Sequence, residues 1–254
     1  MIQNYKDYIK EHLDIDPFNE EDWEFDNLSL LLQIVRHKFG DVPYDEITEL
    51  RCSHNQLTSL EGIEKLVNLS TLYCNDNQLT SLEKIENLVN LEAFDCDYNQ
   101  LTSLEGVENL VNLEKLYCSD NQLTSLEGVE NLVNLKVLCC GDNQLISLKG
   151  IENLVNLEKL YCGYNQLISL EGLENFVNLN TLHCINNQLT SLEGIENLVN
   201  LNKIYCDFNQ LTMLKGIENL VNLKELYCNH NRFSKDYKKY LKNYCRNKNI
   251  SLDI

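Results

Sequence analysis

The sequence repeats itself every 22 residues over most of its length of 254 residues. Nine cysteines recur at this interval, and an asparagine lies three residues after each of them: Cys52, Cys74, Cys96, Cys118, Cys140, Cys162, Cys184, Cys206 and Cys228, with asparagines from Asn55 to Asn231. A unit this short cannot bury an apolar side alone, so it must stack on its neighbours to share one core. The period therefore predicts a solenoid.

The arrangement within one unit predicts its path. Counted from Leu113, the unit is LEKLYCSDNQLTSLEGVENLVN, with apolar residues at positions 1, 4, 6, 11, 14, 17 and 20. Positions 4 to 6 alternate, with Leu116 and Cys118 inward and Tyr117 outward, which predicts a short strand. The later apolar residues come at every third position, which favours a tight 3₁₀-like or extended return path over an α-helix.

The repeated asparagine at position 9 lies where the chain must bend away from the strand. Backbone groups that turn inward at such a bend need hydrogen-bond partners, and a buried amide side chain offers both donors and an acceptor. We therefore expect a ladder of nine stacked asparagines that ties each turn to the next.

This frame resembles the leucine-rich repeat family, whose units follow LxxLxLxxNxL. The run NQLTSLEGIENLVNLNKIYCDFN (187–209) resembles the 22-residue class of SDS22-like phosphatase regulators and of internalins. The near-identical copies with a strand cysteine are also similar to leucine-rich repeat proteins of giant DNA viruses. Position 6 departs from the family pattern, because cysteine stands where leucine is usual.

The resemblance implies an α/β fold: a right-handed leucine-rich repeat solenoid with a parallel concave sheet of about nine short strands and helical caps at both ends. We expect an N-terminal helical cap over 1–46, leucine-rich repeats over 47–233, and a C-terminal capping helix and tail over 234–254. No binding residue of a family member is carried over, since those residues lie at variable positions that do not match.

Both ends carry helical patterns. In the first 46 residues, apolar side chains have helical spacing in two groups: Tyr5, Tyr8, Ile9 and Leu13, then Leu28, Leu31, Leu32 and Val35. Asn27 can begin the second helix, and Gly40 with Pro43 can end it. Near the other end, Ser234 is the expected N-cap of a helix with an apolar stripe.

The exposed side of this last helix is basic, with Lys235, Lys238, Lys239, Lys242 and Arg246. Such a surface can bind an acidic partner or phosphates, or it can be the solvated face that every solenoid cap requires. We favour the second interpretation.

Position 16 tests the turn geometry. It is glycine in seven of the eight complete units and lysine, Lys84, in the remaining one. A lysine is disfavoured at positive φ. We therefore predict ordinary negative φ for these glycines, or a local distortion in the repeat of Lys84.

Four roles are open to the repeated cysteine: metal ligand, disulfide partner, nucleophile or core packing. Zinc sites use close spacings such as CxxC, and Cys139 and Cys140 are adjacent strand residues that point to opposite faces. Disulfides between neighbouring strands would need Cβ atoms closer than a sheet provides. Free cysteine packs as a small hydrophobe, so we interpret the nine as core.

Cys139 is the exception, because position 5 faces outward. A thiol nucleophile needs a base at about 3 Å, whereas His183 lies two strands away, roughly 10 Å by strand spacing. We therefore predict no catalytic residue, no metal and no cofactor, and we expect that the chain is not an enzyme. Cys139 is the thiol that we expect to be modified most readily.

Charge and hydropathy restrict the partners. The formal charge of −18 argues against nucleic acid, whose phosphates require a basic surface. No stretch of 18 apolar residues is present, so no membrane span is predicted. The beginning, MIQNYKDYIKEHLDID, lacks the pattern of a signal peptide, and we expect a cytoplasmic monomer.

Two glutamate columns contribute most of this charge. Position 18 is glutamate in all eight complete units, and position 15 is glutamate in six. The columns can repel wrong partners or attract basic ones. They can also be a solubilising surface copied with each duplication, which is the interpretation that we favour.

Function is expected at outward positions that vary between repeats, namely 3, 5, 7 and 8. The predicted protein-binding residues on the concave face are Tyr73, Tyr98, Tyr117, Tyr161, Tyr164, His183, Ile185, Tyr205, Phe208 and Tyr227. Aromatic side chains are enriched in interface hot spots, but tyrosines in register can equally stack and stabilise the sheet.

Aspartates on the same face would attract a protein with a basic surface: Asp76, Asp95, Asp97 and Asp120. We favour a non-enzymatic protein–protein interaction module. The alternatives are a regulatory subunit of an enzyme such as a phosphatase, and a self-assembling structural protein.

Overall fold

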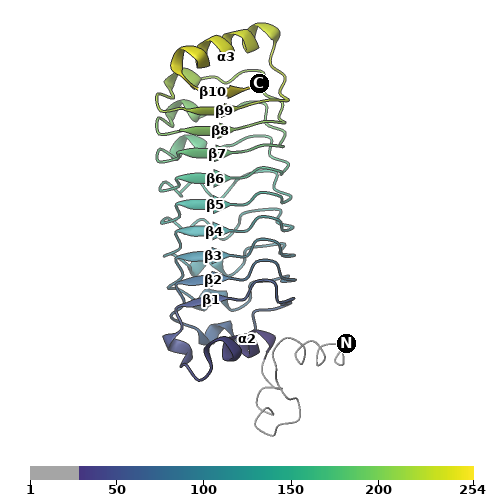
Figure 1. Ribbon diagram of the computed structural model, residues 1–254, viewed down its shortest axis with the longest axis vertical. Helices are drawn as coiled ribbons and strands as arrows, with labels where there is room; N and C mark the ends of the chain where they lie inside the picture. Colours follow the sequence, from purple (N-terminus) through teal and green to yellow (C-terminus); the bar gives the residue numbers. More distant parts are fainter. Residues whose placement is uncertain (1–28) are drawn as a thin grey trace.

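The computed structural model describes residues 29–254 and contains one sheet of ten parallel strands in sequence order. The strands stack along the long axis of the molecule (Figure 1). They are β1 (Glu49–Arg51), β2 (Thr71–Tyr73), β3 (Ala93–Asp95), β4 (Lys115–Tyr117), β5 (Val137–Cys139), β6 (Lys159–Tyr161), β7 (Thr181–His183), β8 (Lys203–Tyr205), β9 (Glu225–Tyr227) and β10 (Ser251–Asp253). The predicted parallel solenoid is confirmed, with one strand more than expected.

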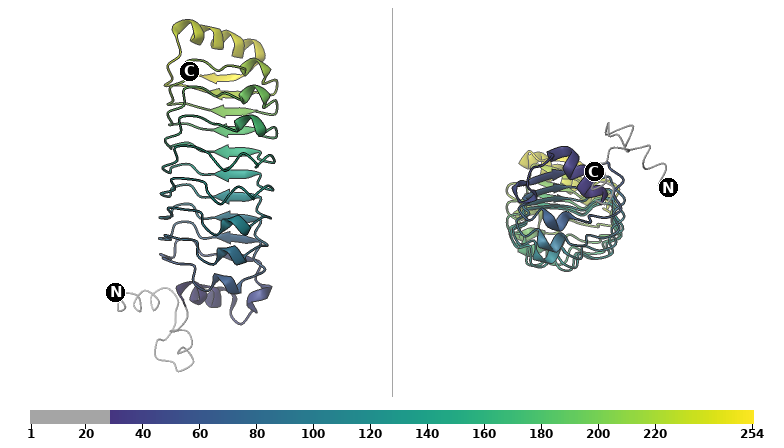
Figure 2. Two further views of the ribbon diagram at one scale, coloured as in Figure 1. Left: turned by 180° about the vertical axis from the view of Figure 1, so that it is seen from behind. Right: turned by 90° about the horizontal axis from the view of Figure 1, so that it is seen from below.

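The register follows the repeat, because each residue of β1 to β8 pairs with its equivalent 22 residues later. Leu50 pairs with Leu72, for example, and Leu116 with Leu138. Positions 4 and 6 point inward, and all nine repeated cysteines are fully buried. Seen along the long axis, successive repeats largely overlap, so the stack is close to straight (Figure 2).

The return path lies on the side opposite the sheet and contains short 3₁₀ helices, as the spacing predicts (Figure 2). These helices are η3 (Ile63–Lys65), η4 (Ile85–Asn87), η5 (Val107–Asn109), η6 (Leu173–Asn175), η7 (Ile195–Asn197) and η8 (Ile217–Asn219), and another, η2 (Tyr44–Glu46), precedes β1. The repeats that contain Val129 and Ile151 turn at this point without a 3₁₀ helix.

The expected asparagine ladder is present. The Asn121 amide Nδ2 donates to the carbonyl oxygens of Cys96, Cys118 and Ser119 at 3.0, 3.3 and 3.0 Å. Its Oδ1 accepts from the Leu101 amide at 2.9 Å. Because Cys96 and Leu101 belong to the preceding repeat, each asparagine from Asn77 to Asn231 satisfies the turns of two repeats at once.

The prediction for position 16 is wrong. The glycines have positive φ, from 83° at Gly216 to 105° at Gly150, and Lys84 is also left-handed, with φ 69° and ψ 2°. The repeat of Lys84 keeps its strand and its 3₁₀ helix. Its smaller φ lies close to the left-handed region that a residue with a Cβ can occupy, and its Nζ lies 3.6 Å from Glu64 Oε1.

In five repeats the position-18 glutamate holds this turn: Glu64, Glu108, Glu130, Glu152 and Glu196. The carboxylate of each accepts a hydrogen bond from the glycine amide two residues earlier. Glu108 Oε2 accepts from Gly106 and Glu130 Oε2 from Gly128, both at 2.8 Å. The column is therefore more than a solubilising surface, because it pairs a backbone amide that the left-handed turn leaves open.

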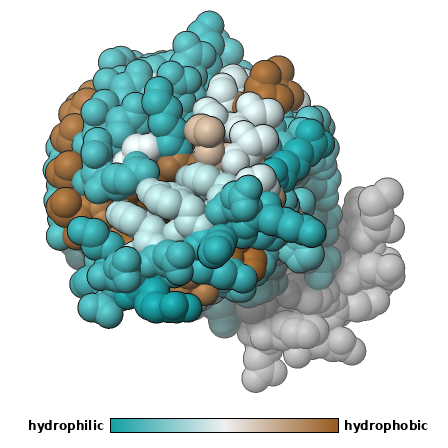
Figure 3. Space-filling view, turned by 90° about the horizontal axis from the view of Figure 1, so that it is seen from above, coloured by the Kyte–Doolittle hydropathy of each residue, from teal (hydrophilic) through white to brown (hydrophobic). Residues whose placement is uncertain are grey.

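Helices close both ends of the described stack. Helix α2 (Leu30–Phe39) begins at Ser29, whose hydroxyl accepts from the Leu32 amide, and ends at Gly40. Asn27 and the first predicted helical group lie outside the described residues. Helix α3 (Lys235–Lys248) begins at Ser234, as predicted. The end that it covers is mostly hydrophilic (Figure 3).

The tail after α3 returns to the sheet. It forms β10, which pairs in parallel with β9, Leu252 beside Leu226. We described this segment only as a tail, although the alternation of Ile250, Leu252 and Ile254 is the pattern of a strand. The division into a cap over 1–46, repeats over 47–233 and a cap over 234–254 stays a proposal.

Candidate protein-binding face

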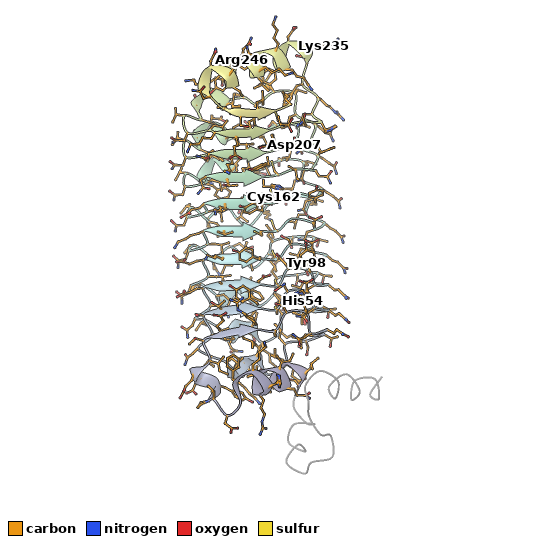
Figure 4. The ribbon with its side chains drawn as sticks, in the orientation of Figure 1. His54, Tyr98, Cys162, Asp207, Lys235 and Arg246 are labelled. Carbon is orange, nitrogen blue, oxygen red and sulfur yellow. The ribbon has the colours of Figure 1, made fainter. Side chains whose placement is uncertain are left out.

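The strand face consists of the outward side chains at position 5, which ends each strand, and at positions 7 and 8 in the turn that follows. Figure 4 labels His54 and Tyr98 from position 8 and Asp207 from position 7. The parallel register places equivalent residues of successive repeats beside one another, so each position forms a column along the molecule.

In the C-terminal half of the strand face, the position-5 rings contact one another in sequence. Ring centroids are 5.9 Å apart between Tyr161 and His183, 5.5 Å between His183 and Tyr205, and 4.9 Å between the stacked rings of Tyr205 and Tyr227. The Tyr205 hydroxyl also donates to Glu225 Oε2 at 2.8 Å. We call these four residues the aromatic ladder.

Position 8 has left-handed backbone in every repeat, with φ between 48° and 60°. Aspartate, asparagine and histidine tolerate this conformation comparatively well and occupy most of the column. Tyr98, Tyr164 and Phe208 do not belong to these types, yet they share the conformation and are 55%, 47% and 53% exposed. The sequence did not indicate this feature, because the bend itself imposes the dihedral angle.

The N-terminal half of the strand face is acidic. Burial, and then the nearby charge of Asp95, raise the pKa of Asp97 to about 7. The pKa of Asp95 is itself raised by burial. Asp97 Oδ1 accepts from the Ser119 amide at 2.5 Å, and Asp95 Oδ1 accepts from the Asp97 amide at 3.1 Å. Burial also raises the pKa of Asp120.

Cys139 lies between Tyr117 and Tyr161 in the position-5 column, where the two halves meet. It is partly exposed, whereas the nine repeated cysteines are buried. Burial, and then the charges of Asp97 and Asp95, raise the pKa of the Cys139 thiol to about 12. The thiol is therefore accessible but weakly nucleophilic at neutral pH.

The predicted residues fall into three groups of rings and one isoleucine. Tyr161, His183, Tyr205 and Tyr227 come together in the aromatic ladder. Tyr73 and Tyr117 share this column but are separated by Asp95. Tyr98, Tyr164 and Phe208 form the third group of rings at position 8, and Ile185 at position 7 lies with His183 over Gly163.

Sequence reasoning left out two residues of the strand face, Arg51 and His230, and one position-3 residue that contacts it, Glu225. The Arg51 guanidinium lies 4.4 Å from the centroid of the Tyr73 ring, and the His230 ring stacks on Phe208 at 4.1 Å. Glu225 pairs with Lys203 at 2.8 Å and holds Tyr205. Arg51 and His230 occupy the same columns as predicted residues, so the repeat period was the signal that could have found them.

Within residues 29–254, no group of three or more histidine, cysteine, aspartate or glutamate side chains is arranged to hold a metal ion. None of the helices in this described part is long and apolar enough to cross a membrane. The strand face is a broad open surface, suited to a macromolecule rather than to a small molecule.

The chain was compared with known proteins. It matches the family described as Leucine Rich repeats (2 copies) over residues 45–87, 67–109, 89–131 and 133–175. No curated protein matches it. Because the family match spans more than half of the sequence, the chain belongs to the leucine-rich repeat family.

Similar solved structures include three internalins of Listeria monocytogenes. Internalin C2 is 30% identical, with TM-score 0.69 over 71% of this chain and 80% of that one. The functional domain of InlJ, which includes a cysteine ladder, is 29% identical, with TM-score 0.68 over 76% and 46% of the two chains. The internalin inlF has TM-score 0.76 at 24% identity, covering 82% of this chain and 61% of that one.

The chain thus spans about three fifths of the length of inlF, and the likeness to inlF concerns the fold alone. The resemblance to internalins is confirmed at the level of structure. The resemblances to SDS22-like regulators and to viral repeat proteins stay predictions.

Proposed function

We propose that this protein is a non-enzymatic binding module that holds a protein partner against the strand face. Leucine-rich repeat proteins generally act in protein–protein interaction. The observation that carries the proposal is the set of exposed aromatic rings at position 8. A left-handed residue with a Cβ costs roughly 1–2 kcal/mol, and these rings are half exposed, so burial within the chain does not offset that cost.

Aspartate or asparagine would fill the same positions with less strain, as they do at Asp76, Asp120, Asp142 and Asn186. Backbone strain that the fold does not need is a reason to look for function. Large rings at exposed positions supply contact area with little loss of side-chain freedom, which is what interface hot spots use. We therefore assign Tyr164 and Phe208 to the centre of the binding surface.

The aromatic ladder serves both sheet and partner in this proposal. Its rings contact one another, which supports the sheet-stabilising alternative for position 5, yet they remain partly exposed beside Tyr164 and Phe208. The aspartates of the N-terminal half would attract a basic surface and accelerate association at low salt. The partner is thus expected to bear lysine or arginine near an apolar centre.

A cytoplasmic location belongs to the proposal. Eleven free cysteines are present in the described residues, and a reducing compartment keeps thiols in this state. The alternative of a regulatory subunit for an enzyme such as a phosphatase rests on the resemblance of the repeat and fits the same surface.

The test uses a displayed library of random peptides selected on the wild-type protein. Peptides that bind should be enriched in lysine, arginine and apolar residues, and should lose binding to a Tyr164→Asn, Phe208→Asn variant. That variant should melt at the wild-type temperature or above it, because asparagine relieves the left-handed strain.

The matched variant is Tyr161→Ala, Tyr205→Ala, which removes stacked rings and should lower the melting temperature by a few degrees. Selected peptides that bind the Tyr164, Phe208 variant as well as wild type would refute the assignment. So would a selection that yields no basic enrichment.

A further inference from the structure

A row of exposed valines runs along one flank of the stack. Position 21 is valine in all eight complete units, and each is 42–50% exposed except the last, at 78%: Val67, Val89, Val111, Val133, Val155, Val177, Val199 and Val221. At about 4.8 Å per strand, the row is some 34 Å long. A contiguous apolar row of this length is unusual on the surface of a monomer.

The backbone beneath the row is fixed. From Asn90 to Asn222, the asparagine that follows each valine donates through Nδ2 to the carbonyl oxygen of the valine one repeat earlier, as in Asn112 to Val89 at 2.9 Å and Asn134 to Val111 at 2.9 Å. This second asparagine ladder is exposed, unlike the one at position 9. It presents the valines in a rigid row, so that little freedom is lost when they are covered.

The valine flank carries no net charge, unlike the molecule as a whole. A depression of about 460 Å³ beside the row is lined by its asparagines and by Glu114, Lys136 and Glu158. Positions 19, 21, 22 and 2 together hold three basic and three acidic side chains: Lys65, Lys136 and Lys224 against Glu92, Glu114 and Glu158. Lys136 Nζ and Glu114 Oε1 are paired at 2.6 Å.

We propose that the valine flank is a contact surface between two copies of this chain, packed side by side and antiparallel. Copies with a charge of −18 repel each other through the strand face and through the glutamate columns. A flank without net charge avoids this repulsion, and the valine flank adds an apolar row to it. The valine flank also runs the whole length of the repeats, which suits the roughly 800 Å² per partner of a standard interface.

The spacing identifies the occupant as a second copy. A row with one apolar side chain per repeat can pack along its whole length only against a surface whose side chains have the same spacing. A two-fold axis brings the same surface of another copy against it, so that the valines of one copy fit between those of the other. From the sequence we expect a monomer, and the valine flank is the reason to revise that expectation.

Sedimentation velocity tests the proposal on the full chain, from about 1 µM to about 100 µM. We expect a reversible dimer that becomes stronger from about 50 mM to about 500 mM NaCl, because salt screens the repulsion between the acidic copies. A Val111→Lys, Val133→Lys, Val155→Lys variant should stay monomeric under all these conditions.

The control variant, Thr80→Lys, Thr102→Lys, Thr124→Lys, adds the same charge at exposed position 12 and should still dimerise. Both variants reduce the net negative charge, so charge alone cannot explain a loss confined to the valine variant. A wild type that is monomeric throughout, a dimer that survives the valine substitutions, or equal loss in both variants would overturn the proposal. Peptide binding by the strand face does not depend on the outcome, and it should weaken with salt.

Discussion

The two halves of the strand face share one backbone and differ in how their side chains interact. In the N-terminal half, from β2 to β5, carboxylates of Asp95 and Asp97 crowd together and separate the tyrosines. In the C-terminal half, from β6 to β9, the rings of the aromatic ladder stack in sequence. Because the register is the same in both halves, the residue type in each column decides whether neighbouring side chains repel or attract.

The difference has an energetic consequence. Stacked aromatic pairs contribute about 0.5–1.5 kcal/mol each beyond the burial of their area. The aspartates instead carry a penalty for burial, which their raised pKa values report. The acidic half is therefore less stable and produces a strong negative electrostatic field. The aromatic half is more stable and presents apolar surface area. Four experiments test this difference between the two halves.

The largest expected effect is equal in both halves, because it concerns the common scaffold. Asn121→Leu, in the acidic half, and Asn187→Leu, in the aromatic half, each remove four hydrogen bonds and leave one buried backbone N–H, that of Leu101 or Leu167, without a partner. We expect each to lower the free energy of unfolding by about 3 kcal/mol or more. Urea titration measures this, and an unequal loss would show that the repeats are not energetically equivalent.

The second effect separates the halves in binding. With a peptide selected on wild type, Asp95→Asn, Asp120→Asn should lower the association rate about tenfold at low salt, through loss of steering. The Tyr164→Asn, Phe208→Asn variant should instead raise the dissociation rate. Surface plasmon resonance at two salt concentrations distinguishes these results. An unchanged association rate in the aspartate variant would contradict the proposal that the acidic half steers the partner and the aromatic half retains it.

The third effect is a pH dependence of stability in the acidic half. The pKa of Asp97 is raised to about 7, against an ordinary value near 3.9. Between these values the folded chain retains a proton that the unfolded chain has lost, so stability falls as pH rises through this window and then levels.

Asp97→Asn keeps an acceptor for the Ser119 amide and removes the charge. Its melting temperature should match wild type near pH 4 and exceed it by a few degrees at pH 8. Asp207→Asn is the counterpart in the aromatic half, where an aspartate accepts from the Asn229 amide. A pH-independent difference for Asp97→Asn would show that its charge is not the cause.

The smallest effect lies at the boundary between the halves. A bulky thiol reagent should label Cys139 before any of the nine buried cysteines, but slowly, because its pKa is raised to about 12. Asp97→Asn should accelerate this labelling, since the Asp97 charge contributes to the shift. Mass spectrometry of peptides identifies the labelled thiol. Early labelling of Cys118 or Cys162 in the native protein would mean that these cysteines are not core.

Much of the scaffold could be predicted from the repeat. The alternation at Leu116, Tyr117 and Cys118 predicted the direction of each side chain, and the three-residue spacing predicted the 3₁₀ return path. Both patterns are local: each follows from a side-chain period that the backbone geometry alone determines. The same logic correctly predicted that the cysteines pack in the core and that Asn121 binds turns of two repeats.

Contacts between residues that lie far apart in the sequence could not be predicted from these local patterns. The pairing of β10 with β9 depends on how α3 returns the chain to the sheet, and the left-handed backbone at Lys84 and Tyr164 is imposed by the bends at positions 16 and 8. The sequence by itself determined the period, the core and the columns of the strand face. Only the tertiary structure decided which rings touch, which carboxylates crowd and which dihedral angles are strained, because these depend on how closely the repeats approach in space.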